Sequence, residues 1–200
     1  MERSTQSGRS LLELLAALAV TAAVLGMTLP PLADARHAAG LAAASMEISG
    51  MILRCRLQAV TRATAVGLVF DRGDDGWEAF VAVDGDGDGI RSRDLATGRD
   101  RRVGRTLHFR RGGAGPGILV GVGVPDPSGR GMLGGDLADP IRCGRGDILT
   151  FTSRGTATPA SIYLSDGHRR MRVLRIYGAT AKVHQMTWRI GQEAWRPIGS

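Results

Sequence analysis

The sequence contains none of the short motifs that carry the commonest enzymatic chemistry. It has no G-x-x-x-x-G-K-[ST] phosphate loop, and no G-x-G-x-x-G stands between a strand and a helix, so nucleotide binding is not expected. The four histidines form no H-E-x-x-H or other recognisable zinc-ligand pair, and no G-x-S-x-G nucleophile turn is present. Because no acid, base and nucleophile converge in the sequence, the chain is predicted not to be an enzyme and to need no cofactor.

Aromatic residues and lysine are scarce as well. Aromatic residues make up 4% of the chain, and Lys182 is its only lysine, so nearly all of the 26 basic residues are arginines. The net charge of +7 permits contact with nucleic acid or an anionic surface, but the chain lacks a platform of aromatic rings for stacking bases. Nucleic-acid binding is therefore possible without being required.

Only two cysteines are present, Cys55 and Cys143. A periplasmic location would permit a disulfide between them. The other interpretation is that Cys55 is a small buried hydrophobic residue on a helix face. The sequence leaves both open, because it does not show whether the two Cα atoms come within bridging range.

One long apolar run is present, and it contains a single charged residue. The run extends from Leu11 to Leu29, ends before Pro30 and Pro31, and includes Glu13 near its start. At about 1.5 Å per residue, a helix of this length crosses the hydrocarbon core of a bilayer. A carboxylate at such a depth costs roughly 2.5–3.5 kcal/mol and persists mainly where it has a partner. Glu13 is therefore a candidate functional residue.

Two other kinds of N-terminal segment share some of these features. A secretory signal peptide has an apolar core of about 7–15 residues followed by a cleavage site, and this run is longer and leads into a helical pattern. A plain membrane anchor is the second alternative. If the apolar run stays on the protein as a membrane anchor, Arg3 and Arg9 precede the span. We then expect a single-pass inner-membrane protein with a cytoplasmic N-terminus and a periplasmic head.

The start of the chain resembles the class III signal of type IV prepilins and type II secretion pseudopilins. In that family a short polar leader ends in Gly, and an apolar stretch follows with Glu at its fifth residue. Here Gly8 ends the leader, Glu13 is fifth from Arg9, and Pro30 is twenty-second, where members often carry a helix-kinking proline. Arg9 departs from the family's usual Phe.

This resemblance implies several roles for these residues. A prepilin peptidase would cleave between Gly8 and Arg9 and methylate the new amine of Arg9. Glu13 would pair with the free amine of a neighbouring subunit during filament assembly. The implied partners are other pseudopilins or pilins, the prepilin peptidase and an inner-membrane assembly platform.

Beyond the proline pair, an amphipathic helix is predicted to about Thr64. Arg54, Arg56 and Arg62 lie off its apolar face. That face is formed by residues spaced by seven, four, three and four positions, namely Leu41, Ile48, Ile52, Cys55 and Ala59. We therefore expect one long helix, kinked near Pro30, whose second half packs on a globular head.

The rest of the chain changes to short β-type runs separated by Gly and Asp. The pair Asp166 and Gly167 predicts a hairpin turn. Strands are predicted over 66–70, 77–83, 105–110, 118–124, 148–151, 161–164, 171–177 and 182–188, with loops over 112–117 and 125–135. The predicted fold class is α+β, with a long N-terminal helix packed on an antiparallel sheet. The predicted division is leader 1–8, transmembrane segment 9–31, amphipathic continuation 32–64 and head 65–200.

The C-terminal half resembles the head of GspH/FimT-type pseudopilins. That head carries an F-x-x-x-G turn, a hairpin and a final turn with Gly, matched here by Phe151 and Gly155, by 162–164 with 172–176, and by Gly178. The resemblance implies a pilin-like minor pseudopilin. Its role would be that of a structural tip or priming subunit of a type II secretion pseudopilus, supporting protein secretion across the outer membrane.

The alternative within the same resemblance is a minor pilin of a type IV pilus, involved in pilus assembly or DNA uptake. Some such members bind DNA through an arginine-bearing turn after the final Gly. Here that turn runs from Gly178 to Lys182 without arginine. A separate basic patch at Arg169, Arg170 and Arg172 is interpreted either as a DNA phosphate contact or as a solvated edge that discourages aggregation.

An acidic repeat between two predicted strands resembles a calcium loop. An EF-hand requires an acid at its twelfth position, which is Leu95 here, and the neighbouring Arg91 and Arg93 oppose cation binding. The alternative interpretation is a solvated Asp-Gly turn. The possible calcium ligands are the alternate acids of this segment, Asp84, Asp86, Asp88 and Asp94.

Overall fold

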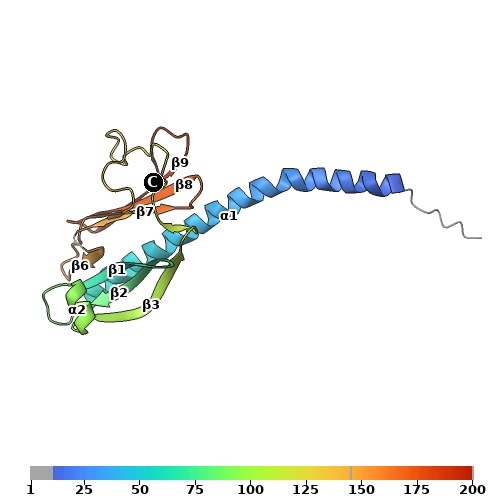
Figure 1. Ribbon diagram of the computed structural model, residues 1–200. Helices are drawn as coiled ribbons and strands as arrows, with labels where there is room; N and C mark the ends of the chain where they lie inside the picture. The colour runs from blue at the N-terminus through green and yellow to red at the C-terminus, as the bar shows by residue number, and fades with distance from the viewer. Residues whose placement is uncertain (1–10, 145, 200) are drawn as a thin grey trace, which may run out of the picture. The chain divides into compact units, whose positions relative to one another are not determined.

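The computed structural model describes residues 11–144 and 146–199, with the backbone alone over 24–31. The chain divides into two units, residues 1–37 and 38–200. Figure 1 labels most of the helices and strands described below. The predicted leader over 1–8 lies outside the described residues.

A single long helix begins the described chain. α1 comprises Leu11–Arg62 and is built largely from alanine and leucine, which favour the helical state. It ends where Ala63 takes a left-handed backbone conformation with a φ of 53°. The backbone is helical through position 30, and the kink predicted at Pro30 stays a prediction.

Among the described residues, no helix has a stretch both long enough and apolar enough to cross a membrane. The transmembrane segment predicted over 9–31 is therefore not confirmed and stays a prediction. The α+β class with a helix packed on antiparallel sheet is confirmed.

The first of two sheets has the order β3-β2-β1-β6, and every neighbouring pair is antiparallel. Its strands are β1 Val66–Gly73, β2 Gly76–Val83, β3 Arg101–Arg110 and β6 Ile148–Phe151. A short helix that the sequence did not predict, α2 Ser92–Thr97, lies in the connection from β2 to β3.

The second sheet has the order β10-β9-β8-β7-β4, with β5 also paired to β7. Its strands are β4 Gly115–Pro116, β5 Ile141–Cys143, β7 Ala160–Ser165, β8 Arg170–Tyr177, β9 Lys182–Arg189 and β10 Arg196–Pro197. The predicted hairpin of β7 and β8 around Asp166 and Gly167 is confirmed.

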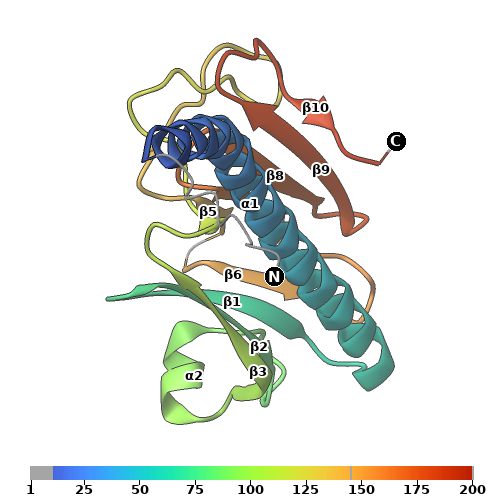
Figure 2. The same cartoon turned by 90° about the vertical axis from the view of Figure 1, so that its right-hand side faces the viewer.

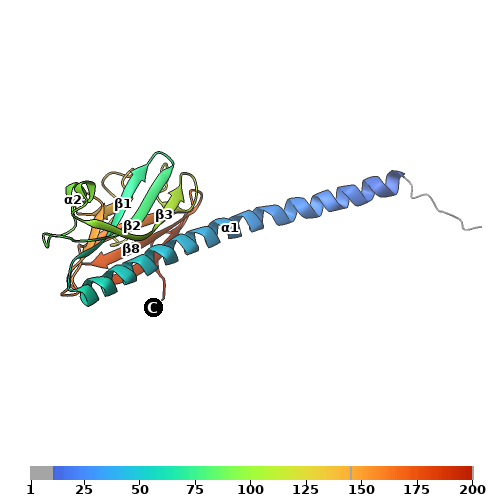
Figure 3. The ribbon, with the colours of Figure 1, turned by 90° about the horizontal axis from the view of Figure 1, so that it is seen from below.

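The second half of α1 packs on both sheets within the unit 38–200 (Figures 2 and 3). Leu41, Ile48 and Cys55 of α1 share one buried cluster with Leu149 of the first sheet and Ile162 of the second. The helix face predicted to be apolar and core-facing is therefore confirmed. Burial of each such aliphatic side chain contributes about 1.5–3 kcal/mol, so this face holds the helix on the head.

A second apolar cluster covers the other face of the second sheet. Trp188 and Trp195 lie there with ring centroids 6.3 Å apart, together with Tyr163 and Met171 of the sheet. The indole N–H of Trp195 donates to the Pro125 carbonyl at 2.7 Å, which ties the C-terminal segment to the long loop before β5.

The prediction of a strand over 118–124 is wrong. Ile118, Leu119 and Val124 are buried in the second cluster, but the segment is irregular and pairs with no strand in the described chain. Gly121 has a φ of 80°, which breaks an extended run. The residues of this segment are apolar because the loop covers the second sheet and its side chains are buried there.

Candidate functional site

Glu13 lies in the first turn of α1, surrounded by exposed leucines. Leu11, Leu12, Leu15 and Leu18 all have most of their side-chain surface exposed, and Glu13 is itself exposed. The other residues of the predicted signal, Gly8 and Arg9, lie outside the described residues. The structure thus places Glu13 on an apolar surface that the described chain does not cover.

A second exposed apolar surface runs along α1 in the head unit. It consists of residues spaced alternately by four and three positions, which we call the α1 seam: Ala39, Ala43, Met46, Gly50, Leu53, Leu57 and Val60. All seven are exposed, with Met46 at 71%, Leu53 at 66% and Leu57 at 62%. Alternating steps of four and three keep residues on one face of a helix and are the spacing along which two helices pack.

The α1 seam lies opposite the face that packs on the head. At about 3.6 residues per turn, the buried residues Ile48, Ile52 and Cys55 fall on the side of the helix away from Leu53 and Leu57. Long apolar side chains in line on a surface mark an interaction site more often than scattered ones. α1 therefore has two apolar faces, and the head covers one of them.

Polar contacts reinforce the buried face and fix the rotation of α1. The hydroxyl of Ser45, which is fully buried, donates to the side-chain oxygen of Gln185 on β9 at 3.2 Å. The Gln185 amide nitrogen donates to the Ser49 hydroxyl at 2.9 Å, and that hydroxyl donates to the Ser45 carbonyl at 2.7 Å. Because these hydrogen bonds are directional, they hold the α1 seam pointed away from the head.

The acidic loop is closed by its own backbone. The carboxylate of Asp84, which is buried, accepts N–H bonds from Asp86, Gly87 and Gly89 at 2.8–3.1 Å. Asp100, also buried, accepts from the N–H groups of Gly85 and Arg91 across the loop. These bonds satisfy the buried carboxylates with donors from the loop itself.

The predicted calcium ligands come together only in part. Ligand oxygens of Asp84, Asp86 and Asp88 lie within 4.8 Å of one another, and Asp94 is not a member of this group within the described residues. Arg91 forms an ion pair with Asp88, and Arg93 lies 3.6 Å from the same carboxylate. The loop geometry is thus explained without a cation, and calcium binding stays a prediction.

The basic patch predicted at the β7–β8 turn is not a continuous exposed surface. The Asp166 carboxylate organises the turn by accepting the N–H groups of His168, Arg169 and Arg170. The side chain of Arg170 is only 20% exposed and lies 4.0 Å from Asp166. Arg172 is half-buried on a central strand, where loss of solvent lowers the pKa of its guanidinium. Of the three predicted arginines, only Arg169 is exposed.

Cys55 and Cys143 are free thiols, so the disulfide that the sequence left open is not formed in the structure. Both are buried in the main cluster, which confirms the alternative interpretation of Cys55 as a small core residue. Burial raises the pKa of each thiol to about 12, because a thiolate is poorly solvated there.

We therefore expect neither thiol to react with a maleimide at pH 8 in the folded protein. Both should react once the chain is unfolded in guanidinium, since only the thiolate is the nucleophile. A Leu53→Cys variant is the matched control, because its added thiol is exposed on the same helix and should be labelled at once. Fast labelling of Cys55 or Cys143 in the folded wild-type protein, followed by mass spectrometry, would contradict the buried positions.

No protein family model matches the chain, and no curated protein or solved structure is significantly similar to it.

Proposed function

We propose that this protein is a minor pseudopilin of the GspH/FimT type, a structural tip or priming subunit of a type II secretion pseudopilus. The observation that carries the proposal is the second apolar face of α1, the α1 seam. A helix that is held on one side by its own head and is apolar on the other fits between a globular domain and other helices. The occupants of the seam would be the corresponding helices of other pilin-like subunits.

The resemblance of the N-terminal sequence to a prepilin signal supports the same proposal and does not depend on the α1 seam. A prepilin peptidase would cleave between Gly8 and Arg9 and methylate the new amine. The subunit would remain in the inner membrane through the apolar run 11–29, with its head in the periplasm, until an assembly platform adds it to the filament. The membrane anchor in this proposal rests on the sequence of that run.

The type IV pilus and DNA-uptake alternative is less well supported by the head. It needs arginines available to phosphates, and the half-buried Arg170 and Arg172 are poorly placed for that contact. The turn from Gly178 to Lys182 also lacks arginine. We therefore prefer the secretion role.

Deletion of the gene in its own host tests the proposal. With an in-frame deletion, exoproteins should accumulate in the periplasm and return to the medium when the wild-type gene is restored, as measured by mass spectrometry of both fractions. Unchanged secretion together with lost piliation or transformation would replace the secretion role by the pilus role. No change in any of these would overturn both.

Glu13→Ala should reduce incorporation into the filament by about tenfold or more while leaving the head folded. The variant leaves the amine of the neighbouring subunit without a partner, and an unpaired charge in hydrocarbon is disfavoured by roughly 2.5–3.5 kcal/mol, so tenfold is a lower bound on the effect. Incorporation is measured by shearing filaments from cells and quantifying the subunit, and folding by the near-ultraviolet signal of the purified protein. Glu13→Gln keeps the shape without the charge and should behave like Glu13→Ala. Normal incorporation of both variants would contradict charge pairing.

A further inference from the structure

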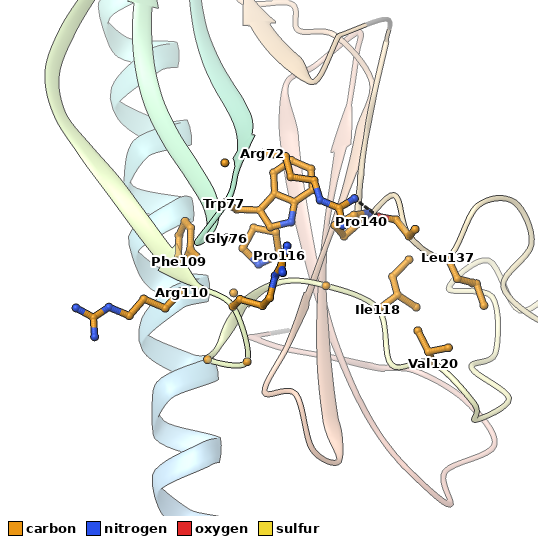
Figure 4. Close-up of a pocket in the computed structure, with 17 residues that line it drawn as sticks. Arg72, Gly76, Trp77, Phe109, Arg110, Pro116, Ile118, Val120, Leu137 and Pro140 are labelled. Carbon is orange, nitrogen blue, oxygen red and sulfur yellow. Dashed lines mark hydrogen bonds between the residues drawn. The ribbon is translucent and has the colours of Figure 1, made fainter.

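A cavity lies where the ends of the two sheets meet, and no residue of the α1 seam lines it. It is formed by the end of β1, the start of β2, the end of β3, β4 and two loop segments, 117–120 and 137–140, and has a volume of about 330 Å³. Figure 4 shows Trp77, Pro116 and Pro140 grouped on one side, with Ile118, Leu137 and Val120 beyond them. We call this hollow the arginine cavity, for the cations described below.

The backbone holds this cavity open. At Gly76, a Cβ atom would lie 2.0 Å from the Phe109 carbonyl oxygen, and the φ of 142° also favours glycine there. At Gly115, a Cβ atom would lie 2.7 Å from the Cβ of Phe109. These two glycines therefore let β2, β3 and β4 approach one another closely at one end of the cavity, where a larger residue would force the strands apart.

Three arginines and no carboxylate are among the residues that line the arginine cavity, and Figure 4 shows the side chain of Arg110 directed away from it. They are Arg72, Arg110 and Arg111, all exposed, and none forms an ion pair with another described residue. The Arg72 guanidinium lies 5.9 Å from the Trp77 ring centroid and donates to the Ala138 carbonyl at 3.5 Å, so it is oriented over the apolar floor (Figure 4). Asp74 and Asp75 of the nearby β1–β2 turn are not among the lining residues.

An apolar floor beside guanidinium groups that form no ion pair with another described residue suits a ligand that is both apolar and anionic. Guanidinium groups bind carboxylates in a fork geometry, and a half-buried indole with two prolines accepts an aliphatic or aromatic side chain. A free phosphate would leave the floor uncovered, whereas a duplex needs a broad cationic surface and not a hollow of this volume. Pockets of this size bury one or a few side chains.

We propose that the arginine cavity binds an extended acidic segment of another protein, with an apolar side chain placed on Trp77 and neighbouring carboxylates held by Arg72 and Arg111. The site is independent of the α1 seam. It would give the head a specificity for its partner that the helix contacts do not supply.

The test uses the full-length protein in mild detergent and a dye-labelled hexapeptide library. The library contains Asp or Glu at two positions and Leu, Phe or Trp at one, and a matched library replaces the acids by Asn and Gln. Binding is measured by fluorescence anisotropy for wild-type protein, for Arg72→Gln with Arg111→Gln, and for Arg130→Gln with Arg154→Gln. The last pair removes the same net charge from exposed positions outside the arginine cavity.

The acidic library should bind wild-type protein at least about tenfold more tightly than the neutral library, and the Arg72/Arg111 variant should lose that preference. The Arg130/Arg154 variant should bind like wild-type protein. Equal loss in both variants would show that the overall charge attracts the peptides and would overturn the site. So would the absence of any preference for acidic peptides, or equally effective competition by inorganic phosphate or single-stranded DNA.

Discussion

Replacement of Leu53 and Leu57 by aspartate is expected to abolish incorporation of the protein into a filament while leaving its head folded. Both side chains are largely exposed, so the two changes together should lower the free energy of unfolding by only about 1 kcal/mol, mostly through the lower helix propensity of aspartate. In a packed helix–helix contact, each leucine would contribute about 1.5–3 kcal/mol, and each new carboxylate would be buried without a partner. Incorporation should therefore fall to background.

The measurement is the amount of the variant in sheared filaments relative to its amount in the cell membrane fraction. Ser153→Asp with Ala179→Asp is the matched control, because it adds the same charge at two exposed head positions. This control should assemble normally. Normal assembly of the Leu53/Leu57 variant would contradict the α1 seam as the contact surface. It would leave the exposed apolar stripe unexplained and remove the main support for the proposed function.

Much of α1 could be predicted because its two halves carry strong local patterns. The spacing of Leu41, Ile48, Ile52 and Cys55 identified the core face correctly, since side chains that recur with the helical period share one side. The α1 seam has an equally regular spacing in the sequence. Three of its seven members are alanine or glycine, so its hydrophobic pattern is weaker than that of the core face.

The head was predictable where hydrophobic alternation and turn residues coincide. The hairpin around Asp166 and Gly167 is such a case. The segment 118–124 shows the opposite. It is a loop that covers a sheet, and such a loop needs buried apolar residues just as a strand does, so its hydrophobic pattern alone does not distinguish the two. α2 is short and lies in a loop closed by Asp84 and Asp100, so its formation depends on contacts that are distant in sequence.

The arginine cavity lies beyond sequence reasoning for the same physical reason. Its cations and its apolar floor come from three separate stretches of chain, 72–77, 109–120 and 137–140. The glycines that let these stretches approach are recognisable as turn-forming residues, but the sequence does not show which strands they bring together. The excess of arginines over carboxylates in this cavity depends on which stretches the fold brings together, so no single stretch of the sequence reveals it.

The two apolar faces of α1 should differ sharply in what they contribute to stability. Ile48→Ala is expected to lower the free energy of unfolding by about 2–5 kcal/mol, because it removes a fully buried side chain from the main cluster and leaves a cavity. Met46→Ala, two positions away on the α1 seam, should change it by no more than about 0.5 kcal/mol, because Met46 is 71% exposed.

Guanidinium denaturation of both variants, followed by tryptophan fluorescence, measures this difference directly, since all three tryptophans lie in the head. If Met46→Ala destabilised the isolated protein as much as Ile48→Ala, the seam would already be covered within one chain and would not be free for another subunit. If neither variant were destabilised, α1 would not be packed on the sheets as described. Only a large effect at Ile48 with a small effect at Met46 fits a helix that is anchored on one side and open on the other.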